Sequence, residues 1–183
     1  MATPLRVPGA TLHCEFVSAA HEAALLAAVN AAPWNCELKR RTQHYGYKYD
    51  YKARTALQRI GDLPEWAMPI VSTLCEEGGP FASAPPNQLI VNEYEPGQGI
   101  APHTDARVFG DTIVSLSLGA DVVMDFRRGE EHHAVALPRR SLLVLRGAVR
   151  ATWTHGIAPR RSDGGARRAI RISLTFRVVP PQN

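Results

Sequence analysis

Short stretches of alternating apolar and polar residues fill the second half of the chain, and no other feature restricts the fold as strongly. Gly, Pro or charged turns, which cannot continue a strand, separate these stretches. Strands at this spacing after two helices are typical of an α+β, mainly β fold, and we expect a double-stranded β-helix (jelly roll) braced by the N-terminal helices. The predicted strands are Leu89–Tyr94, Thr112–Leu118, Val122–Arg127, Ala134–Leu137, Ser141–Leu145, Ala151–His155 and Arg171–Val179.

Two segments of the first half predict the helices. Ser18 is a typical N-cap, and the amphipathic segment after it ends near Pro33. Asp62, with Glu65 three residues later, predicts a capped second helix that ends near Glu77. Both helices are expected to be scaffold.

The length of 183 residues favours one domain with a buried core. We therefore expect a single domain over 1–183, with a jelly-roll core over about 87–179. No run reaches the ~18 apolar residues of a membrane helix, and the first residues lack the apolar stretch of a secretory signal. These features predict a monomer without membrane association, located in the cytoplasm, with the nucleus as the alternative. The three cysteines form no CxxC pair, and free buried thiols are expected.

Positive charge is concentrated in the last quarter of the chain. Residues 1–138 hold 11 Lys and Arg against 16 Asp and Glu, whereas residues 139–183 hold 10 against Asp163 alone. Such a basic block is suited to a polyanion, and nucleic acid is the first candidate partner. A solvated arginine-rich surface is the alternative on charge alone.

Four of the five tyrosines occupy every second position of one segment: Tyr45, Tyr47, Tyr49 and Tyr51. Strict alternation predicts that all four rings lie on one face of a strand or hairpin. One interpretation is a substrate-binding lid over about 34–60, in which the rings stack on bases while nearby cations bind phosphates. The alternative is an aromatic strand that is buried against the sheet.

A histidine and a carboxylate follow the strand and turn that begin at Asn87. His103 and Asp105 are two residues apart, so in an extended segment their side chains point the same way. His155 stands at the end of a later predicted strand, which a jelly roll can bring to the same place. Two histidines and one aspartate are the facial ligand set of non-haem Fe(II) oxygenases. For His155 alone, a core histidine is the alternative.

The last predicted strand alternates apolar and polar side chains. Arg171, Ser173 and Arg177 share one face with Thr175, and apolar residues occupy the other. Guanidinium groups on an inner face need anions, because an unpaired buried charge is costly, and the fork of arginine suits a carboxylate. An exposed strand with solvated arginines is the alternative.

The motifs of this half follow one another in a fixed order: Asn92-x-Tyr94, Pro96-Gly97, His103-x-Asp105, His155-Gly156-Ile157 and Arg171-x-Ser173-Leu174-Thr175-Phe176-Arg177. This ordered set resembles the AlkB family of Fe(II)/2-oxoglutarate dioxygenases over half the chain. By that resemblance, His103, Asp105 and His155 hold Fe(II), which works with 2-oxoglutarate and O₂.

The same resemblance implies a co-substrate site. Asn92 and Tyr94 hydrogen-bond 2-oxoglutarate, and Arg171 forms a salt bridge with its distal carboxylate. Arg177 supports the site near Asp105. Many members carry Asn where this chain has Ser173, so one co-substrate contact is expected to be weaker.

Within the family, the amino-acid sequence resembles the AlkB domain of the eukaryotic tRNA wobble-uridine hydroxylases. The stretches N-E-Y-E-P-G-Q-G-I, V-V-M-D-F and R-R-T-Q-H-Y-G-Y carry this likeness. Those proteins also contain an RNA-recognition domain and a methyltransferase domain, and neither fits in 183 residues. The resemblance therefore implies a tRNA substrate and a separate methyltransferase partner.

The expected activity is hydroxylation of a modified base in nucleic acid, in particular the side chain of a tRNA wobble uridine. Arg107 stands where DNA-repairing relatives have an acidic residue, which disfavours a cationic methylated base. The alternative is oxidative demethylation of alkylated bases in single-stranded DNA or RNA; a protein hydroxylase and a non-catalytic metal-binding jelly roll are further alternatives. Position and charge suggest these substrate contacts: Tyr45, Tyr47 and Tyr49 for stacking, and Arg127, Arg128 and Arg139 for phosphates.

Overall fold

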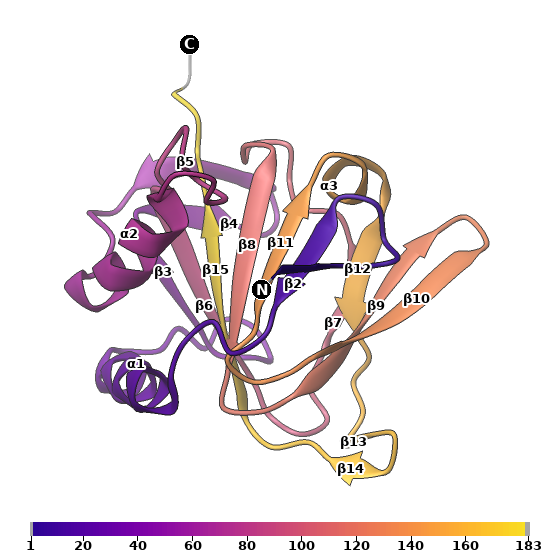
Figure 1. Ribbon diagram of the computed structural model, residues 1–183. Helices are drawn as coiled ribbons and strands as arrows, with labels where there is room; N and C mark the ends of the chain where they lie inside the picture. The colour runs from indigo at the N-terminus through magenta and orange to yellow at the C-terminus, as the bar shows by residue number, and fades with distance from the viewer. Residues whose placement is uncertain (1, 182–183) are drawn as a thin grey trace.

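The computed structural model describes residues 2–181 and contains two antiparallel sheets that face each other (Figure 1). The larger sheet has the strand order β1-β2-β11-β8-β15-β6-β3, and the smaller has the order β10-β9-β12-β7. This is the expected jelly roll. The strands of the larger sheet are β1 (Ala2–Pro4), β2 (Ala10–His13), β3 (Thr42–Tyr45), β6 (Gln88–Tyr94), β8 (Thr112–Leu118), β11 (Leu142–Arg146) and β15 (Arg171–Arg177). Those of the smaller sheet are β7 (Ile100–His103), β9 (Val122–Arg128), β10 (Glu131–Leu137) and β12 (Thr154–Ile157).

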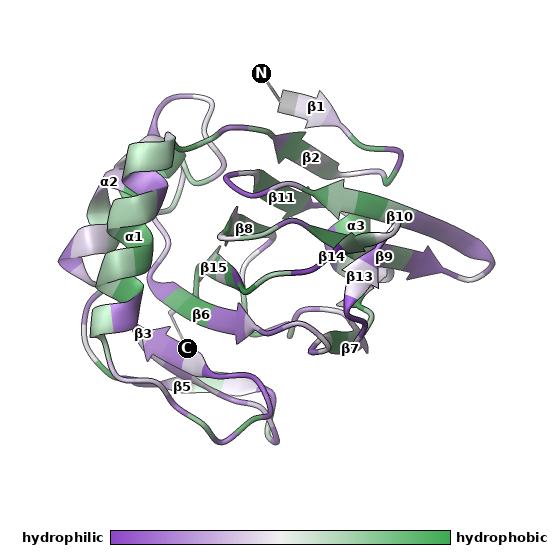
Figure 2. Ribbon diagram, turned by 90° about the horizontal axis from the view of Figure 1, so that it is seen from below, coloured by the Kyte–Doolittle hydropathy of each residue, from purple (hydrophilic) through white to green (hydrophobic). Residues whose placement is uncertain are grey.

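The remaining elements lie around the two sheets. Two short hairpins are formed by β4 (Tyr47–Asp50) with β5 (Thr55–Arg59), and by β13 (Ser162–Asp163) with β14 (Ala166–Arg167). The helices are α1 (Ala19–Ala31), a 3-10 turn η1 (Glu65–Ala67), α2 (Met68–Cys75) and α3 (Ala148–Thr152). Figure 2 shows α1 and α2 on one side of the larger sheet, while the smaller sheet lies on the other side. No helix in the described residues is long and apolar enough to cross a membrane.

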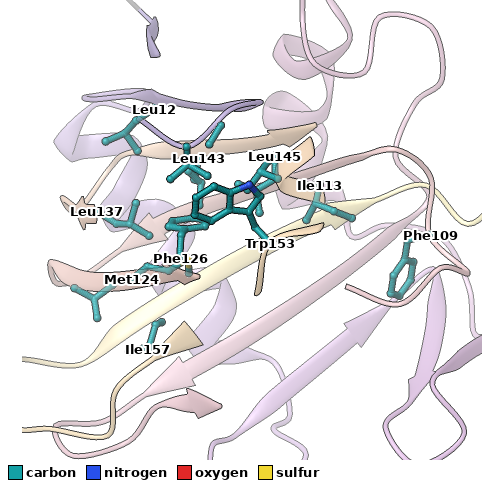
Figure 3. Packing of buried hydrophobic residues seen from close by; sticks show 14 of the residues in the cluster. Leu12, Phe109, Ile113, Met124, Phe126, Leu137, Leu143, Leu145, Trp153 and Ile157 are labelled. Carbon is teal, nitrogen blue, oxygen red and sulfur yellow. The ribbon is translucent and has the colours of Figure 1, made fainter. Parts of the chain in front are cut away.

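Two apolar clusters hold these layers together. One packs between the two sheets around Trp153 and Phe126, which are both completely buried (Figure 3). The other packs between the larger sheet and helices α1 and α2, with Leu25 and Leu74 from the helices. Burial of such large side chains supplies most of the driving force for folding.

Strand β15 belongs to both layers because its side chains alternate. Ile172, Leu174 and Phe176 enter the cluster under the helices. The intervening residues, among them Arg171 and Ser173, therefore face the space between the sheets. The central position of β15, between β8 and β6, places this polar row inside the jelly roll.

The first predicted helix is confirmed, and the second is corrected. Ser18 caps α1, and its hydroxyl accepts a hydrogen bond from the His21 backbone N–H at 3.1 Å. Asp62 does not cap a helix, since its carboxylate pairs with Arg59 instead. Pro64 precedes the 3-10 turn, and α2 follows without a side-chain cap.

Three local expectations are wrong. Ala151 belongs to α3 rather than to a strand, because Gly147 (φ +56°) reverses the chain into a short helix. The strand predicted as Ala134–Leu137 begins three residues earlier, at Glu131 of β10, since the hairpin already reverses at Gly129 (φ +55°). The cysteines are free as expected, but Cys14 and Cys36 are exposed rather than buried.

Candidate active site

The structure brings His103, Asp105 and His155 together. His103 ends β7, and its register partner on the neighbouring strand β12 is His155, although 52 residues separate them in sequence. The two imidazole ring centroids are 4.6 Å apart. Asp105 Oδ2 lies 3.4 Å from His155 Nε2. The pairing of β7 with β12 is thus what joins the two halves of this set.

The protonation states of these groups suit metal ligation. Burial alone would raise the pKa of Asp105, but Arg177 and the two histidines hold it at about 2, so the group is a carboxylate. Burial lowers the pKa of His155 to about 4, which leaves a neutral imidazole with a free lone pair. His103 Nδ1 lies 2.8 Å from the Ala101 carbonyl, so Nδ1–H donates and Nε2 is left as the ligand atom.

The chemistry of this donor set fits Fe(II). Two imidazoles and one carboxylate match the ligand types of a non-haem iron site. The three side chains lie close together but do not surround a common point. Within residues 2–181, no three His, Cys, Asp or Glu side chains are spaced to hold a metal ion. His103 is partly exposed, whereas Asp105 and His155 are buried.

Two arginines hold the segment that carries Asp105. Arg177 donates to Asp105 Oδ1 from Nη2 at 2.7 Å and from Nε at 3.0 Å, which leaves Oδ2 directed toward His155. Arg150 donates to the backbone carbonyls of Asp105 (3.0 Å), Ala106 (2.7 Å) and Phe109 (3.1 Å). The support by Arg177 agrees with the role expected for it.

Arg171 lies behind these groups as a buried cation without an acid. Arg171 is 2% exposed, and its guanidinium donates to Ser117 Oγ at 2.8 Å. Its guanidinium carbon lies 5.4 Å from the ring centroid of Tyr94. No carboxylate of the described residues pairs with it, and burial lowers its pKa to about 10. Such a charge needs an anion, because an unpaired buried ion is costly. A bound carboxylate would meet this need.

A cavity of about 60 Å³ joins the candidate ligands to Arg171. Asn92 and Tyr94 line it from β6, directly across from their register partners Ser173 and Arg171 on β15. Ser173 Oγ lies 2.9 Å from Ser115 Oγ. The expected co-substrate residues therefore share one inner wall.

A second, open cleft of about 290 Å³, the outer cleft, lies against two of the candidate ligands, His103 and Asp105. Tyr49, Tyr51 and Phe109 give it aromatic walls, and Arg40 and Arg54 add positive charge. Asp105 is its only acidic lining residue, and Arg177 already neutralises that carboxylate. The cleft is therefore shaped for a flat group that is neutral or negatively charged.

The tyrosines do not share one face, so that prediction is wrong. Gly46 (φ +75°) breaks the segment into β3 and β4, and an added Cβ there would lie 1.8 Å from the Asn87 carbonyl oxygen. Tyr45 packs edge-on against Trp66 in the cluster under the helices. Tyr47 packs against the cluster between the sheets, and neither Tyr45 nor Tyr47 lines the cleft.

None of the predicted phosphate contacts lines the cleft either. Arg127 is exposed outside it, and so is Arg107, the residue expected to disfavour a cationic base. Arg128 pairs with Glu131 and lies 4.8 Å from the Trp153 ring centroid. Arg139 forms a salt bridge with Glu22 on α1.

Sequence reasoning missed several residues of the site. Arg40 stands in a basic run that gave only a charge signal, and Arg54 follows the tyrosine segment. Phe109 and Arg150 carry no motif, since they act through a ring contact and backbone carbonyls. Only the fold shows that these four side chains meet around Asp105.

Comparison with known proteins gives a family match and several relatives. Residues 13–177 match the model of the 2OG-Fe(II) oxygenase superfamily. A mouse (Mus musculus) protein called tRNA (carboxymethyluridine(34)-5-O)-methyltransferase ALKBH8 is 39% identical, over 94% of this chain and 30% of the mouse protein. A zebrafish (Danio rerio) protein called probable RNA/DNA demethylase ALKBH6 is 30% identical, over 91% of this chain and 83% of the zebrafish protein.

A solved structure titled "The structure of OsALKBH1" has the same fold. Its TM-score is 0.74 at 19% sequence identity, with 97% of this chain and all of the other covered. The chain spans about a third of the length of the mouse and the Xenopus tropicalis ALKBH8 proteins that it matches. The comparison therefore concerns one portion of those larger proteins.

Proposed function

This chain belongs to the AlkB family within the 2OG-Fe(II) oxygenase superfamily, and from that premise we propose that it hydroxylates a modified base in nucleic acid, in particular a wobble uridine of tRNA. It is a 2-oxoglutarate-dependent dioxygenase that uses Fe(II), 2-oxoglutarate and O₂. The observation that supports the substrate most is the outer cleft, which offers aromatic rings and arginines next to the candidate ligands but no unpaired carboxylate among its lining residues.

Different residues of the site are assigned to the metal and to the co-substrate. When bound, the iron supplies oxidation of a C–H bond by O₂, coupled to conversion of 2-oxoglutarate into succinate and CO₂. We assign the metal to His103, Asp105 and His155, with Arg177 orienting the carboxylate. Arg171 binds the distal carboxylate of 2-oxoglutarate, and Asn92 and Tyr94 (with Ser173) line its pocket.

The outer cleft then receives the base. We propose that residues 34–60 form the lid over it, with Tyr49 and Tyr51 for stacking. Arg40 and Arg54 bind anionic groups of the substrate. A methylated, cationic base would find no free carboxylate among these lining residues, whereas an acidic uridine side chain would find the cations Arg40 and Arg54.

Oxidative demethylation of alkylated bases is the second candidate. It is supported by the zebrafish relative called a probable RNA/DNA demethylase, whose length this chain covers to 83%. The two candidates share one oxidation and differ in the carbon attacked. When the hydroxylated carbon is bound to nitrogen, the C–N bond breaks, the carbon leaves as an aldehyde and the nitrogen keeps a proton. A hydroxyl on a carbon that is not bound to nitrogen or oxygen stays on the base.

Three further parts of the proposal concern the setting of the reaction. We propose that the chain acts as a monomer in the cytoplasm. The methyl transfer in the name of the mouse relative is assigned to a separate methyltransferase partner rather than to these residues.

Nucleoside mass spectrometry separates the candidates. The Fe(II)-loaded protein is incubated with 2-oxoglutarate and O₂, once with bulk tRNA and once with methylated oligonucleotides. A new hydroxylated uridine supports the proposal, and loss of methyl groups from adenine or cytosine supports the second candidate. His103→Ala is the control. Succinate formation with neither product would contradict both and indicate a protein or small-molecule substrate.

A further inference from the structure

We infer that Arg40 is a positioning residue that fixes the orientation of the Asn92 amide, so that its N–H groups are presented to 2-oxoglutarate. The inference rests on the co-substrate site assigned above. It does not depend on the identity of the oxidised base. Arg40 begins the R-R-T-Q-H-Y-G-Y stretch in the segment between α1 and β3, and the resemblance gives it no role in the site.

The contact joins two elements that are far apart in sequence. Arg40 Nε donates a hydrogen bond to Asn92 Oδ1 at 2.9 Å, across 52 residues. The guanidinium carbon of Arg40 also lies 6.0 Å from the ring centroid of Tyr94 and 5.8 Å from that of Tyr51. Arg40 therefore touches both co-substrate residues of β6 and one aromatic wall of the cleft.

This contact determines which way the Asn92 amide faces. Arginine carries only hydrogen-bond donors, so the atom that meets it must be the carbonyl oxygen. The amide nitrogen is then left with two N–H donors, and Asn92 lines the inner cavity. A dicarboxylate such as 2-oxoglutarate offers only acceptors. The orientation that Arg40 imposes is thus the one that the co-substrate needs.

Arg40 acts from outside the cavity. It lines the outer cleft, whereas Asn92 lines both the cleft and the inner cavity. Arg40 therefore supports the amide from the substrate side and leaves the co-substrate side free. An amide held in its binding orientation before the ligand arrives loses less freedom on binding, which strengthens the interaction.

A matched pair of variants isolates the hydrogen bond from the charge. Counted from the backbone, the amide nitrogen of glutamine occupies the position of arginine Nε, and the terminal methyl of methionine occupies the same position without a donor. Arg40→Gln can therefore keep the bond to Asn92, and Arg40→Met cannot. Lys39→Ala removes a neighbouring, exposed charge and serves as the control.

The measurement is calorimetric titration of 2-oxoglutarate into the Mn(II)-loaded protein without O₂ or nucleic acid. We expect Arg40→Met to weaken binding by about three- to tenfold, the loss of one hydrogen bond. Arg40→Gln and Lys39→Ala should stay within about twofold of wild type. In an Asn92→Ala background, Arg40→Met should cause no further loss. Melting temperatures of the metal-free variants control for misfolding.

Three results would overturn the inference. Equal weakening by Gln and Met would assign the effect to charge, and a full additional loss in the Asn92→Ala background would show that Arg40 acts elsewhere. Wild-type protein that does not bind 2-oxoglutarate would remove the premise. Because no nucleic acid is present, failure of the proposed base oxidation does not affect this outcome.

Discussion

At the scale of single residues, two arginines of β15 have opposite environments. Arg177 is paired with Asp105, whereas Arg171 is buried beside Ser117 and Tyr94 with no acid partner among the described residues. The cost of burying the Arg171 guanidinium is not offset within the chain itself. This difference supports the roles proposed for them, with Arg171 binding a ligand and Arg177 holding Asp105.

Replacing Arg171 by Met tests that distinction. Removing a desolvated cation without a partner should leave the free energy of unfolding unchanged or raise it, because a buried unpaired charge is costly. Binding of 2-oxoglutarate should fall by at least about 30-fold, as expected when a carboxylate loses a charged hydrogen-bond donor. Urea unfolding and calorimetric titration measure the two effects. Strong destabilisation with intact binding would show that Arg171 is structural.

At the scale of elements, Glu22 attaches α1 to the jelly roll. Its carboxylate is 1% exposed, accepts from the Gly119 backbone N–H at 2.8 Å, and pairs with Arg139 and Arg140. Burial alone would raise the pKa of Glu22, but these donors lower it below 4.5. Helix α1 is therefore held by an ionic contact as well as by its apolar face.

Glu22→Gln should destabilise the protein by about 2 kcal/mol, since it leaves donors around a buried position poorly satisfied. Because the folded-state pKa is lowered, the stabilisation by Glu22 is present above pH 4.5 and is lost as the pH falls through the folded value. The variant should therefore show a weaker acid dependence of unfolding. Equal acid dependence in both proteins would contradict this role.

A change in the β4–β5 hairpin is expected to affect binding of the nucleic acid substrate and to leave binding of 2-oxoglutarate unchanged. Tyr51 lines the outer cleft, and its hydroxyl lies 3.3 Å from His44 Nε2, which positions the ring. Tyr51→Ala should weaken tRNA binding by about tenfold, the value of one base-stacking contact. Binding of 2-oxoglutarate should stay unchanged. If gel-shift titrations show the same tRNA affinity for both proteins, the hairpin is not the lid.

Strand β15 and the tyrosine segment show which parts of the fold can be predicted from residue alternation. Alternation predicted the faces of β15 correctly, because β15 is regular and paired on both sides. It failed for the tyrosines, because one glycine with positive φ turns Tyr45 toward the helices and Tyr49 toward the cleft. Periodicity holds within an element and is lost at a turn, so contacts such as that of Arg40 with Asn92 appear only in the folded chain.

At the scale of the whole molecule, the two sheets have separate tasks. The larger sheet carries the residues proposed to bind 2-oxoglutarate, on β6 and β15. The smaller sheet carries both histidines, on β7 and β12. Asp105 follows β7 and is bound by Arg177 from the larger sheet, so it connects the two. The site exists only when the sheets are closed on each other, and the apolar cluster around Trp153 maintains that closure.

The most direct measurement of the central claim is mass spectrometry of tRNA nucleosides after reaction under ¹⁸O₂. A dioxygenase places one oxygen atom of O₂ in succinate and the other in the product. We predict a hydroxylated wobble uridine that carries ¹⁸O, formed together with labelled succinate and absent with His103→Ala. Unmodified wobble uridine together with demethylated adenine or cytosine would contradict the claim, as would tRNA that remains unlabelled while succinate accumulates.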